Sequence, residues 1–321
     1  MRSCRFSIVV TCFNQRSFIR EAIESALVQG ADEVIVVDDG SNDGSAEILQ
    51  EYGDRVSLCP VAKNGGAPRA RNHGTLIATG DYIVFLDGDD ILVPWALTVY
   101  KRVLERHKAV LVLGEKVSFR GPAPTARVGE FAHGPVMFRE YAVPMNKDRS
   151  AGLSASTLVV ERAVLLTVGG WTPEIFHGDI KDLMMKLGYA GPLVLIHEPI
   201  TALYRIHEKN SIHEVGRYIA YAHRLLANER AGGYPGGAAG LGRRYAALGA
   251  YVVFWSRKGM RNGLWKEATQ LVLVSLPMVF FAVAYRTRHL VGRRRRPEHL
   301  DLDLSRFAPE RSAVSNGIGK D

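Results

Sequence analysis

Short apolar runs alternate with amphipathic stretches through the first third of the chain. The runs are rich in β-branched residues and predict strands at 6–10, 34–37, 56–61 and 84–86. The stretches between and after them repeat apolar residues at helical spacing or begin with capping signals, and predict helices at 18–27, at 46–52, from Pro68 and from Pro94 to 107. Such alternation predicts an α/β fold with a mostly parallel, Rossmann-like sheet flanked by helices.

Two of the predicted strands end in acidic residues. Asp38 and Asp39 follow one strand, and Asp87, Asp89 and Asp90 follow another. The carboxyl ends of parallel strands meet at one edge of a sheet, where ligands bind. Carboxylates this close raise one another's pKa unless a cation or hydrogen bonds stabilise them. The pattern therefore predicts a Mg²⁺ or Mn²⁺ site that shares carboxylates with substrate phosphates. For either pair alone, the alternative is an acidic turn exposed to water.

Glycine-rich phosphate-binding motifs are absent from the sequence. No Gly-x-Gly-x-x-Gly follows the first predicted strand, and no Gly-x-x-x-x-Gly-Lys-Ser/Thr occurs anywhere. This counts against a dinucleotide-dependent oxidoreductase and against a P-loop nucleotidase. A nucleotide phosphate would instead be held by metal and arginine.

The cysteine usage and the charge distribution indicate the cellular compartment and the kind of partner. The three cysteines of the 321-residue chain, Cys4, Cys12 and Cys59, show no Cys-x-x-Cys spacing, which indicates a reducing compartment. The N-terminus has no signal-peptide pattern, so we expect the protein in the cytoplasm. The formal charge of +8 is concentrated near the C-terminus, where Arg293–Arg296 form a run. No RNA-binding motif or interleaved aromatic residues accompany it, which argues against nucleic acid as a partner.

The chain divides into three predicted parts: a catalytic domain at 1–213, a helical appendage at 214–296 and a disordered tail at 297–321. The apolar run at 264–285 is shorter than the roughly twenty apolar residues of a bilayer span and contains a proline. We expect residues 264–296 to lie peripherally on the cytoplasmic face of the membrane, with arginines at anionic headgroups. The alternative is a soluble appendage that packs on the catalytic domain.

Four motifs now make the pattern specific, and each lies in the predicted catalytic domain. They are Ser7–Asn14, Val37–Gly44, Asn64-Gly65-Gly66 with Ala70-Arg71-Asn72, and Phe85–Asp90. In order and spacing they resemble the serial motifs of family-two glycosyltransferases. The resemblance implies a GT-A fold and a nucleotide-diphosphate-sugar donor, with UDP-sugars favoured.

The resemblance also implies roles for single residues. Thr11 would lie against the nucleotide base, Asp39 would hydrogen-bond the base or ribose, and Arg71 would help hold the nucleotide. Asp87 would reach the ribose, and Asp89 would coordinate Mn²⁺ or Mg²⁺ between the two phosphates. Asp38 is either a turn residue or part of the site.

The catalytic base is expected shortly after Gly169-Gly170-Trp171, where the family carries a Glu-Asp pair before a helix. This sequence has no such pair: it reads Gly178-Asp179-Ile180-Lys181-Asp182. Asp179 is the preferred base, because an apolar Ile180 cannot take a proton. Asp182 is the reserve candidate, or only a partner of the helix N-terminus.

A further segment, Tyr204-Arg205-Ile206-His207, resembles a family element that follows the last strand. There Arg205 would contact the donor phosphates and His207 the metal or diphosphate. The alternative for His207 is a purely structural role.

The resulting expectation is an inverting glycosyltransferase that adds a single sugar to an acceptor hydroxyl of a glycan or lipid-linked molecule, in cell-surface polysaccharide or glycolipid assembly. Neither the Gln-x-x-Arg-Trp motif nor the several membrane helices of the family's processive synthases occur. The acceptor is expected to meet the loop at 121–149. Two alternatives stay open: a nucleotidyltransferase, and a non-catalytic sugar-nucleotide-binding protein at the membrane.

Overall fold

The computed structural model describes residues 4–124, 136–141, 154–175, 178–208, 210, 214–291, 298–300, 302 and 304. Its strands are β1 (Phe6–Cys12), β2 (Glu33–Asp38), β3 (Ser57–Pro60), β4 (Tyr82–Asp87), β5 (Ile91–Leu92), β6 (Leu111–Phe119), β7 (Val136–Tyr141), β8 (Leu158–Glu161), β9 (Leu193–Arg205) and β10 (Glu298–Leu300). Its α-helices are α1 (Ile19–Leu27), α2 (Ser45–Gln50), α3 (Ala67–Ile77), α4 (Ala96–Arg106), α6 (Arg162–Thr167), α7 (Asp179–Lys186), α8 (Val215–Arg230), α9 (Gly237–Arg261), α10 (Trp265–Val274) and α11 (Leu276–Val291). Single 3₁₀ turns lie at η1 (Gly53–Arg55), η4 (Ala155–Thr157) and η5 (Leu187–Tyr189).

The described strands form one mixed sheet with the order β10-β7-β9-β6-β8-β4-β1-β2-β3, and β5 pairs with β9 off this path. The expected parallel arrangement is found where helices connect consecutive strands: β1 pairs in parallel with β2 and β4, and β2 with β3. Beyond β4 the sheet is mixed, because β8 runs antiparallel to both β4 and β6. The carboxyl ends of β1, β2 and β4 therefore lie at one edge.

Side chains of β1 alternate between two hydrophobic cores, one on each face of the sheet. Ile8 packs in the core that contains Ile19 of α1, whereas Val9 packs in the core that contains Ala70 of α3. Helix α3 approaches closely at Gly74, where a Cβ would lie 2.3 Å from Val9 Cγ1. This close packing fixes α3 beside the edge at which the acidic residues lie.

The C-terminal segment differs from its prediction as a disordered tail. Glu298–Leu300 form β10, which pairs antiparallel with β7, and Leu304 is buried in the core. The rest of 297–321, apart from residue 302, lies outside the described residues. In the expected loop at 121–149, residues 136–141 form β7, while residues 125–135 and 142–149 are likewise not described.

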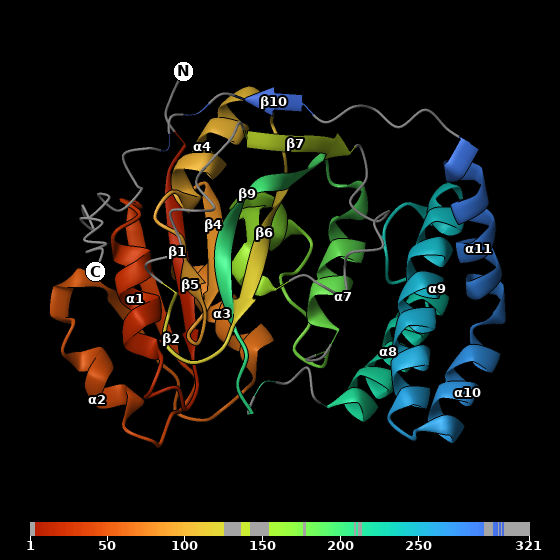
Figure 1. The fold of residues 1–321 in the computed structure, drawn as a ribbon, viewed down its shortest axis with the longest axis horizontal. Coiled ribbons are helices and arrows are strands. Elements are labelled where there is room, and N and C mark those ends of the chain that lie inside the picture. The colour runs from red at the N-terminus through yellow and green to blue at the C-terminus, as the bar shows by residue number, and fades with distance from the viewer. Residues whose placement is uncertain are drawn as a thin grey trace, which may run out of the picture.

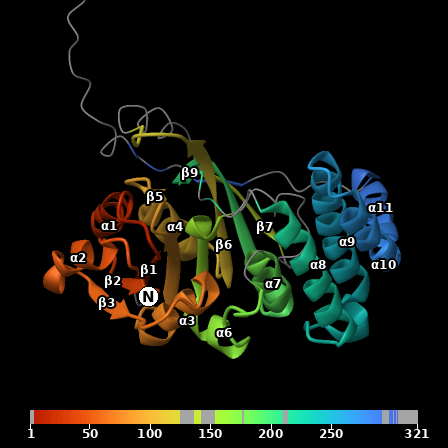
Figure 2. The ribbon, with the colours of Figure 1, turned by 90° about the horizontal axis from the view of Figure 1, so that it is seen from below.

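Helices α8 to α11 form the predicted appendage, which lies beside α7 (Figures 1 and 2) and packs around a hydrophobic core that also includes Ile175 and Met185. The hydroxyl of Tyr234, in the turn between α8 and α9, donates to Asp182 of α7 at 2.6 Å. A buried pair between Glu229 and Arg244, 2.8 Å apart, closes the same turn. The glycine-rich stretch 232–237 between α8 and α9 is therefore held from both sides.

The apolar run predicted as one helix is broken between Val274 and Leu276. Among the helices that the structure describes, none alone has the length and apolarity of a bilayer span. Helix α10 together with Leu276–Ala284 satisfies both criteria only as a pair bent by 75°.

Candidate active site

A cavity of about 730 Å³ opens at the carboxyl edge of β1, β2 and β4, within the size range of small-molecule sites. Its walls come from both parts of the chain: the sheet edge, α3 and α7 on one side, and α8 and α9 on the other. Six of the residues singled out in the sequence line this cavity: Thr11, Asp39, Arg71, Asp87, Asp89 and Asp179. Segments up to 244 residue positions apart, from Thr11 to Trp255, thus meet in a single cavity.

Asp39 holds the loop Asn64-Gly65-Gly66 at the end of the cavity next to β2. Its two carboxylate oxygens accept hydrogen bonds from the backbone N–H groups of Gly65 and Gly66, at 2.9 and 2.7 Å. Burial raises the pKa of this carboxyl, and the two N–H groups oppose that rise. A carboxylate has about four lone-pair sites, so Asp39 can also accept from a ligand. Asp38 does not line the cavity and accepts from Ser41 N–H, as a turn residue does.

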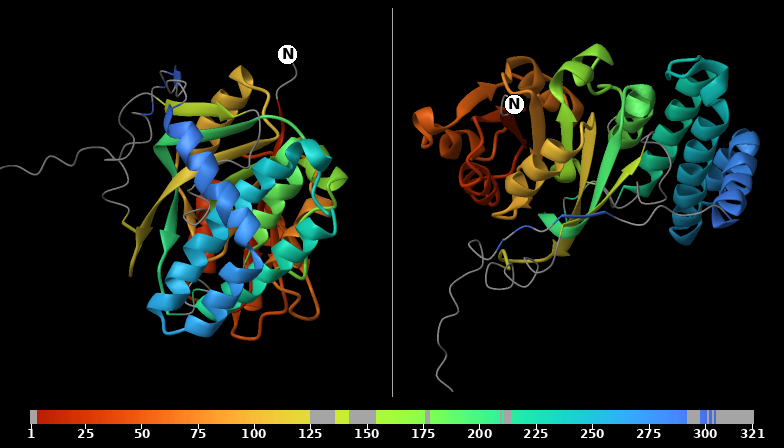
Figure 3. Two further views of the ribbon diagram at one scale, coloured as in Figure 1. Left: turned by 90° about the vertical axis from the view of Figure 1, so that its right-hand side faces the viewer. Right: turned by 90° about the horizontal axis from the view of Figure 1, so that it is seen from above.

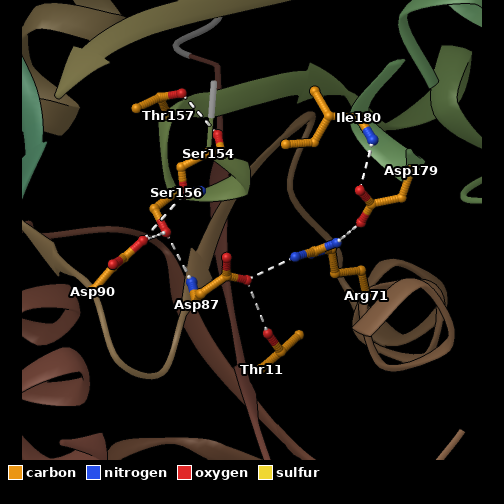
Figure 4. A network of polar contacts seen from close by, with 9 residues as sticks. All are labelled: Thr11, Arg71, Asp87, Asp90, Ser154, Ser156, Thr157, Asp179 and Ile180. Atoms are coloured by element: carbon orange, nitrogen blue, oxygen red, sulfur yellow. Dashed lines mark hydrogen bonds and ion pairs between the residues drawn. The ribbon is translucent and has the colours of Figure 1, made fainter. Parts of the chain in front are cut away.

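Arg71 links two carboxylates at the centre of the cavity (Figure 4). Its guanidinium donates to Asp87 at 2.8 Å and to Asp179 at 2.6 Å, and it lies 4.6 Å from the ring centroid of Trp171. Burial works against the charge of Arg71, but the two carboxylates outweigh it and raise its pKa. Burial also raises the pKa of Asp179, while Arg71 pulls it down. One cation thereby fixes two acids that lie 92 positions apart.

Asp89 and His207 form a pair suited to share a metal ion. Asp89 Oδ2 lies 2.9 Å from His207 Nε2. The contact is a hydrogen bond or ion pair, and its length is also the separation, about 2.9 Å, of two adjacent ligands of an octahedral Mg²⁺ with bonds of 2.0–2.1 Å. Gly88 allows the turn that delivers Asp89, since a Cβ there would lie 2.8 Å from the carbonyl oxygen of Thr11.

A metal held here would need ligands from its substrate as well. No cluster of three or more His, Cys, Asp or Glu side chains in the described part of the chain is arranged to hold an ion. Asp89 and His207 would leave the remaining positions to phosphate oxygens and water, which is how Mg²⁺ is commonly bound beside nucleotides.

Arg205 does not line the cavity, in contrast to its expected role at the donor phosphates. Its guanidinium donates to Asp89 O, to Gly121 O and to the carboxylate of Glu21. Its backbone N–H donates to the buried Asp90 at 3.0 Å. Arg205 therefore supports the loop that carries Asp89 and has its donors engaged by the protein.

Lys116 of β6 is a cavity residue that the sequence did not reveal. Its ammonium lies 3.5 Å from the ring centroid of Tyr204, and within the described ranges it forms no ion pair or hydrogen bond. Burial lowers its pKa, against the opposing effect of Asp90, Asp87 and Glu115. A cation that lines the cavity and is paired with no carboxylate in the described ranges suits an anionic ligand. No motif marks this lysine in the sequence, because it lies in a strand outside the four motifs.

The structure distinguishes between the two candidate catalytic bases. Asp179 lines the cavity, whereas Asp182 is fully buried and does not. The oxygens of Asp182 accept from Thr172 Oγ1 at 2.5 Å and from Tyr234 at 2.6 Å. Asp182 thus joins α7 to the appendage.

Comparison with known proteins yields one family and a shared fold. The family model described as glycosyl transferase family 2 matches residues 7–165. The chain is 31% identical over 159 residues to the putative glycosyltransferase EpsE of Bacillus subtilis, an alignment that covers 43% of this chain and 57% of EpsE. It therefore spans little more than half the length of that relative.

Solved structures resemble most of the chain. S. aureus TarS 1–349 in complex with UDP-GlcNAc matches with a TM-score of 0.63 and 19% identity, over 85% of this chain and 79% of that one. The mannosyltransferase PcManGT from Pyrobaculum calidifontis, in complex with GDP-Man and Mn²⁺, matches with a TM-score of 0.53 and 17% identity, over 88% of this chain and 87% of that one. At these identities the likeness shows the fold, which is the expected GT-A type with a C-terminal helical region.

Proposed function

Because residues 7–165 belong to glycosyl transferase family 2, we propose that this protein transfers a single sugar, with inversion, from a nucleotide-diphosphate sugar to an acceptor hydroxyl. The observation that carries this proposal is the shared cavity in which Asp87 and Asp89 lie beside the Arg71–Asp179 pair. Donor-binding acids and a candidate base thereby face the same space. The expected product is a cell-surface polysaccharide or a glycolipid.

The proposed reaction is one displacement. Asp179 accepts the proton of the acceptor hydroxyl as its oxygen attacks the anomeric carbon. The bond between that carbon and the phosphate oxygen breaks on the opposite face, and its electron pair leaves with the nucleoside diphosphate. A single in-line attack needs one base and no protein nucleophile, and it inverts the anomeric centre. Arg71 holds Asp179 in place through the 2.6 Å contact.

Mn²⁺ or Mg²⁺ is the proposed cofactor, because the spacing of Asp89 and His207 fits such an ion. When bound, it would stabilise the negative charge that develops on the departing diphosphate. The Mn²⁺ in the PcManGT complex supports this choice.

Lys116 is the proposed side-chain contact to the donor diphosphate, in place of Arg205. Its ammonium faces the cavity over Tyr204, whereas the donors of Arg205 are already engaged. A charge-assisted contact with phosphate is roughly twice as strong as a neutral hydrogen bond.

Replacing Lys116 with methionine should therefore lower the affinity for UDP and GDP by about tenfold or more, because a hydrogen bond to a charged group contributes about 1.5–3 kcal/mol. The affinities for uridine and guanosine should stay within about twofold. Calorimetric titration measures all four. Lys101→Met is a matched control, since Lys101 also lies over an aromatic ring, 5.6 Å from the centroid of Phe6, but outside the cavity. Equal losses for diphosphates and nucleosides would contradict the assignment.

The proposed function itself is tested with a panel of UDP- and GDP-sugars in Mn²⁺ or Mg²⁺. Release of nucleoside diphosphate, slowly to water and faster to a sugar acceptor, is the expected outcome. A nucleotidyltransferase would instead release pyrophosphate from a nucleoside triphosphate and a sugar phosphate. A protein that binds nucleotide sugars without turnover would be a non-catalytic binding protein.

Contact with a membrane surface is proposed for α10 and α11, the outermost helices of the appendage (Figure 3). Large apolar side chains are exposed there: Trp265, Leu273, Leu276, Phe280 and Val283. Apolar surface on a helix beside a basic sequence, here Arg293–Arg296, is typical of interfacial membrane binding.

Phe280→Ser should weaken binding to vesicles of phosphatidylcholine with phosphatidylglycerol by about tenfold, because burying a phenylalanine contributes about 1.5–3 kcal/mol. Leu76→Ser of α3 is the control, since Leu76 is 64% exposed against 70% for Phe280 but belongs to the catalytic domain. Co-sedimentation measures both. A wild-type protein that stays in the supernatant would leave α10 and α11 as a plain soluble appendage.

A further inference from the structure

The cavity continues past Asp179 to a wall of aromatic side chains on α8 and α9. The residues that line this end are Pro173, Gly178, Ile180, Lys181, Arg217, Tyr218, Tyr221, Tyr251 and Trp255. The nucleotide end, with Thr11 and Asp39, lies at the carboxyl edge of β1 and β2, whereas the aromatic end is built mainly by the appendage. The proposed donor contacts leave this end without an assigned ligand.

Three of the aromatic rings, those of Tyr218, Tyr251 and Trp255, pack against one another. Tyr218 stacks on Trp255 with ring centroids 3.8 Å apart and planes inclined by 9°. Tyr251 meets the same tryptophan at 6.1 Å with an inclination of 58°. Trp255 and Tyr251 are buried, whereas Tyr218 and Tyr221 are partly exposed. The wall is therefore a preformed surface, which lowers the entropy cost of binding a ligand.

This wall lies directly beside the candidate base. A Cβ at Gly178, the residue before Asp179, would lie 3.2 Å from the Tyr251 hydroxyl. Burial, followed by the neighbouring Tyr218 and Asp179, raises the pKa of Tyr251, so its hydroxyl keeps its proton at neutral pH. A ligand on the wall would thus reach both Asp179 and a neutral hydroxyl.

The chemistry of the wall selects a neutral, hydroxylated ring. Tyrosine combines a flat apolar body with a polar tip, which suits a pyranose: its C–H face lies on the ring and its hydroxyls meet tyrosine hydroxyls. An alkyl chain would find larger exposed apolar surface at Phe280 and Leu273, on different helices.

We propose that the aromatic wall of Tyr218, Tyr221, Tyr251 and Trp255 is the acceptor subsite, and that it binds the sugar ring whose hydroxyl Asp179 deprotonates. This inference rests on the proposed function and deepens it. The helical appendage then has a direct part in the reaction, because it supplies the surface on which the acceptor lies.

The test compares Tyr221→Ala and Tyr218→Ala with the wild type, using methyl pyranosides of several hexoses as acceptors. Each variant should raise the KM for the acceptor by about tenfold or more, as aromatic side chains that anchor a ligand do on truncation. Release of nucleoside diphosphate to water, which needs no acceptor sugar, should stay within about twofold. Tyr245→Ala is the control, since Tyr245 also belongs to the helical appendage, on α9, but packs against Phe281 outside the cavity.

A readout without turnover completes the test. Saturation-transfer NMR should show methyl pyranosides in contact with the wild type in the presence of UDP or GDP, and a loss of that contact in Tyr221→Ala. Unchanged acceptor KM and unchanged NMR contact in both variants would overturn the subsite. A loss seen with octyl but not with methyl pyranosides would also overturn it, since the wall would then bind the alkyl chain. A wild type that releases no diphosphate from any nucleotide sugar would overturn the proposed function instead.

Discussion

Replacing Asp89 with asparagine is expected to slow metal-dependent sugar transfer by about 10²–10³-fold. Asparagine retains the size of the side chain and a partner for His207, which lies 2.9 Å away, but it removes the negative charge that binds a cation. Charge stabilisation by a metal is worth several kcal/mol in a transition state, and each 1.36 kcal/mol is a factor of ten in rate. Release of nucleoside diphosphate at saturating Mn²⁺ measures the effect.

A second measurement ties the loss to the metal. Electron paramagnetic resonance of Mn²⁺, titrated with protein and UDP or GDP, should show weaker binding in Asp89→Asn and unchanged binding in Asp54→Asn. Asp54 is an exposed acid in η1, outside the cavity. An Asp89→Asn protein that loses activity and yet binds Mn²⁺ as the wild type does would refute the assignment of Asp89 as a metal ligand.

Asp179→Asn is expected to lower the transfer rate by about 10²–10⁴-fold, the range typical of a general base. The amide oxygen can still accept from Arg71, so donor affinity should change little. In the wild type, kcat/KM for the acceptor should fall as pH drops through the pKa of Asp179, because only the ionised carboxylate takes a proton. Burial raises that pKa, so the acidic limb of the pH profile of kcat/KM should lie at higher pH than an ordinary aspartate would give. The variant should lose this limb.

Asp182→Asn is the comparison that separates the two candidate bases. Asp182 is fully buried and is held by Thr172 and Tyr234, so its replacement should lower the urea midpoint of unfolding. The remaining folded protein should transfer sugar at nearly the wild-type rate with the same pH profile. Normal transfer by Asp179→Asn together with loss in Asp182→Asn would reverse the assignment.

The strands and helices of the first hundred residues could be predicted from the sequence, because their local signals agree with the tertiary packing. β1, β2 and β4 are buried strands whose apolar runs have no other place in a folded domain, and Pro68 lies in the first turn of α3 as expected. The C-terminal half was less readable. A break at Ser275 divides one apolar run into α10 and α11. Helix α11 packs closely along α9: a Cβ on Gly249 of α9 would lie 2.0 Å from the carbonyl oxygen of Met278. The break allows α11 to take up this position.

The candidate site residues also divide into those that the sequence could place and those that it could not. Thr11, Asp39, Asp87 and Asp89 follow buried strands, so sequence pattern alone could place them at one edge. Arg205 and the reserve base Asp182 were also expected in the site, yet their partners, Glu21 and Tyr234, come from distant segments. Lys116 gave no signal, because a lone lysine in a strand is ordinary until its neighbours are known.

The sequence by itself indicated the resemblance to family-two glycosyltransferases, the alternation of strands and helices, and the acids at the strand ends, because these depend on residues close together in the chain. Only the tertiary structure decided that Asp179 faces the cavity while Asp182 is buried, that Lys116 lines the cavity over Tyr204, and that α8 and α9 close one end of it. Those outcomes depend on which groups from remote segments meet, and burial and charge pairing act on such groups only after the chain has folded.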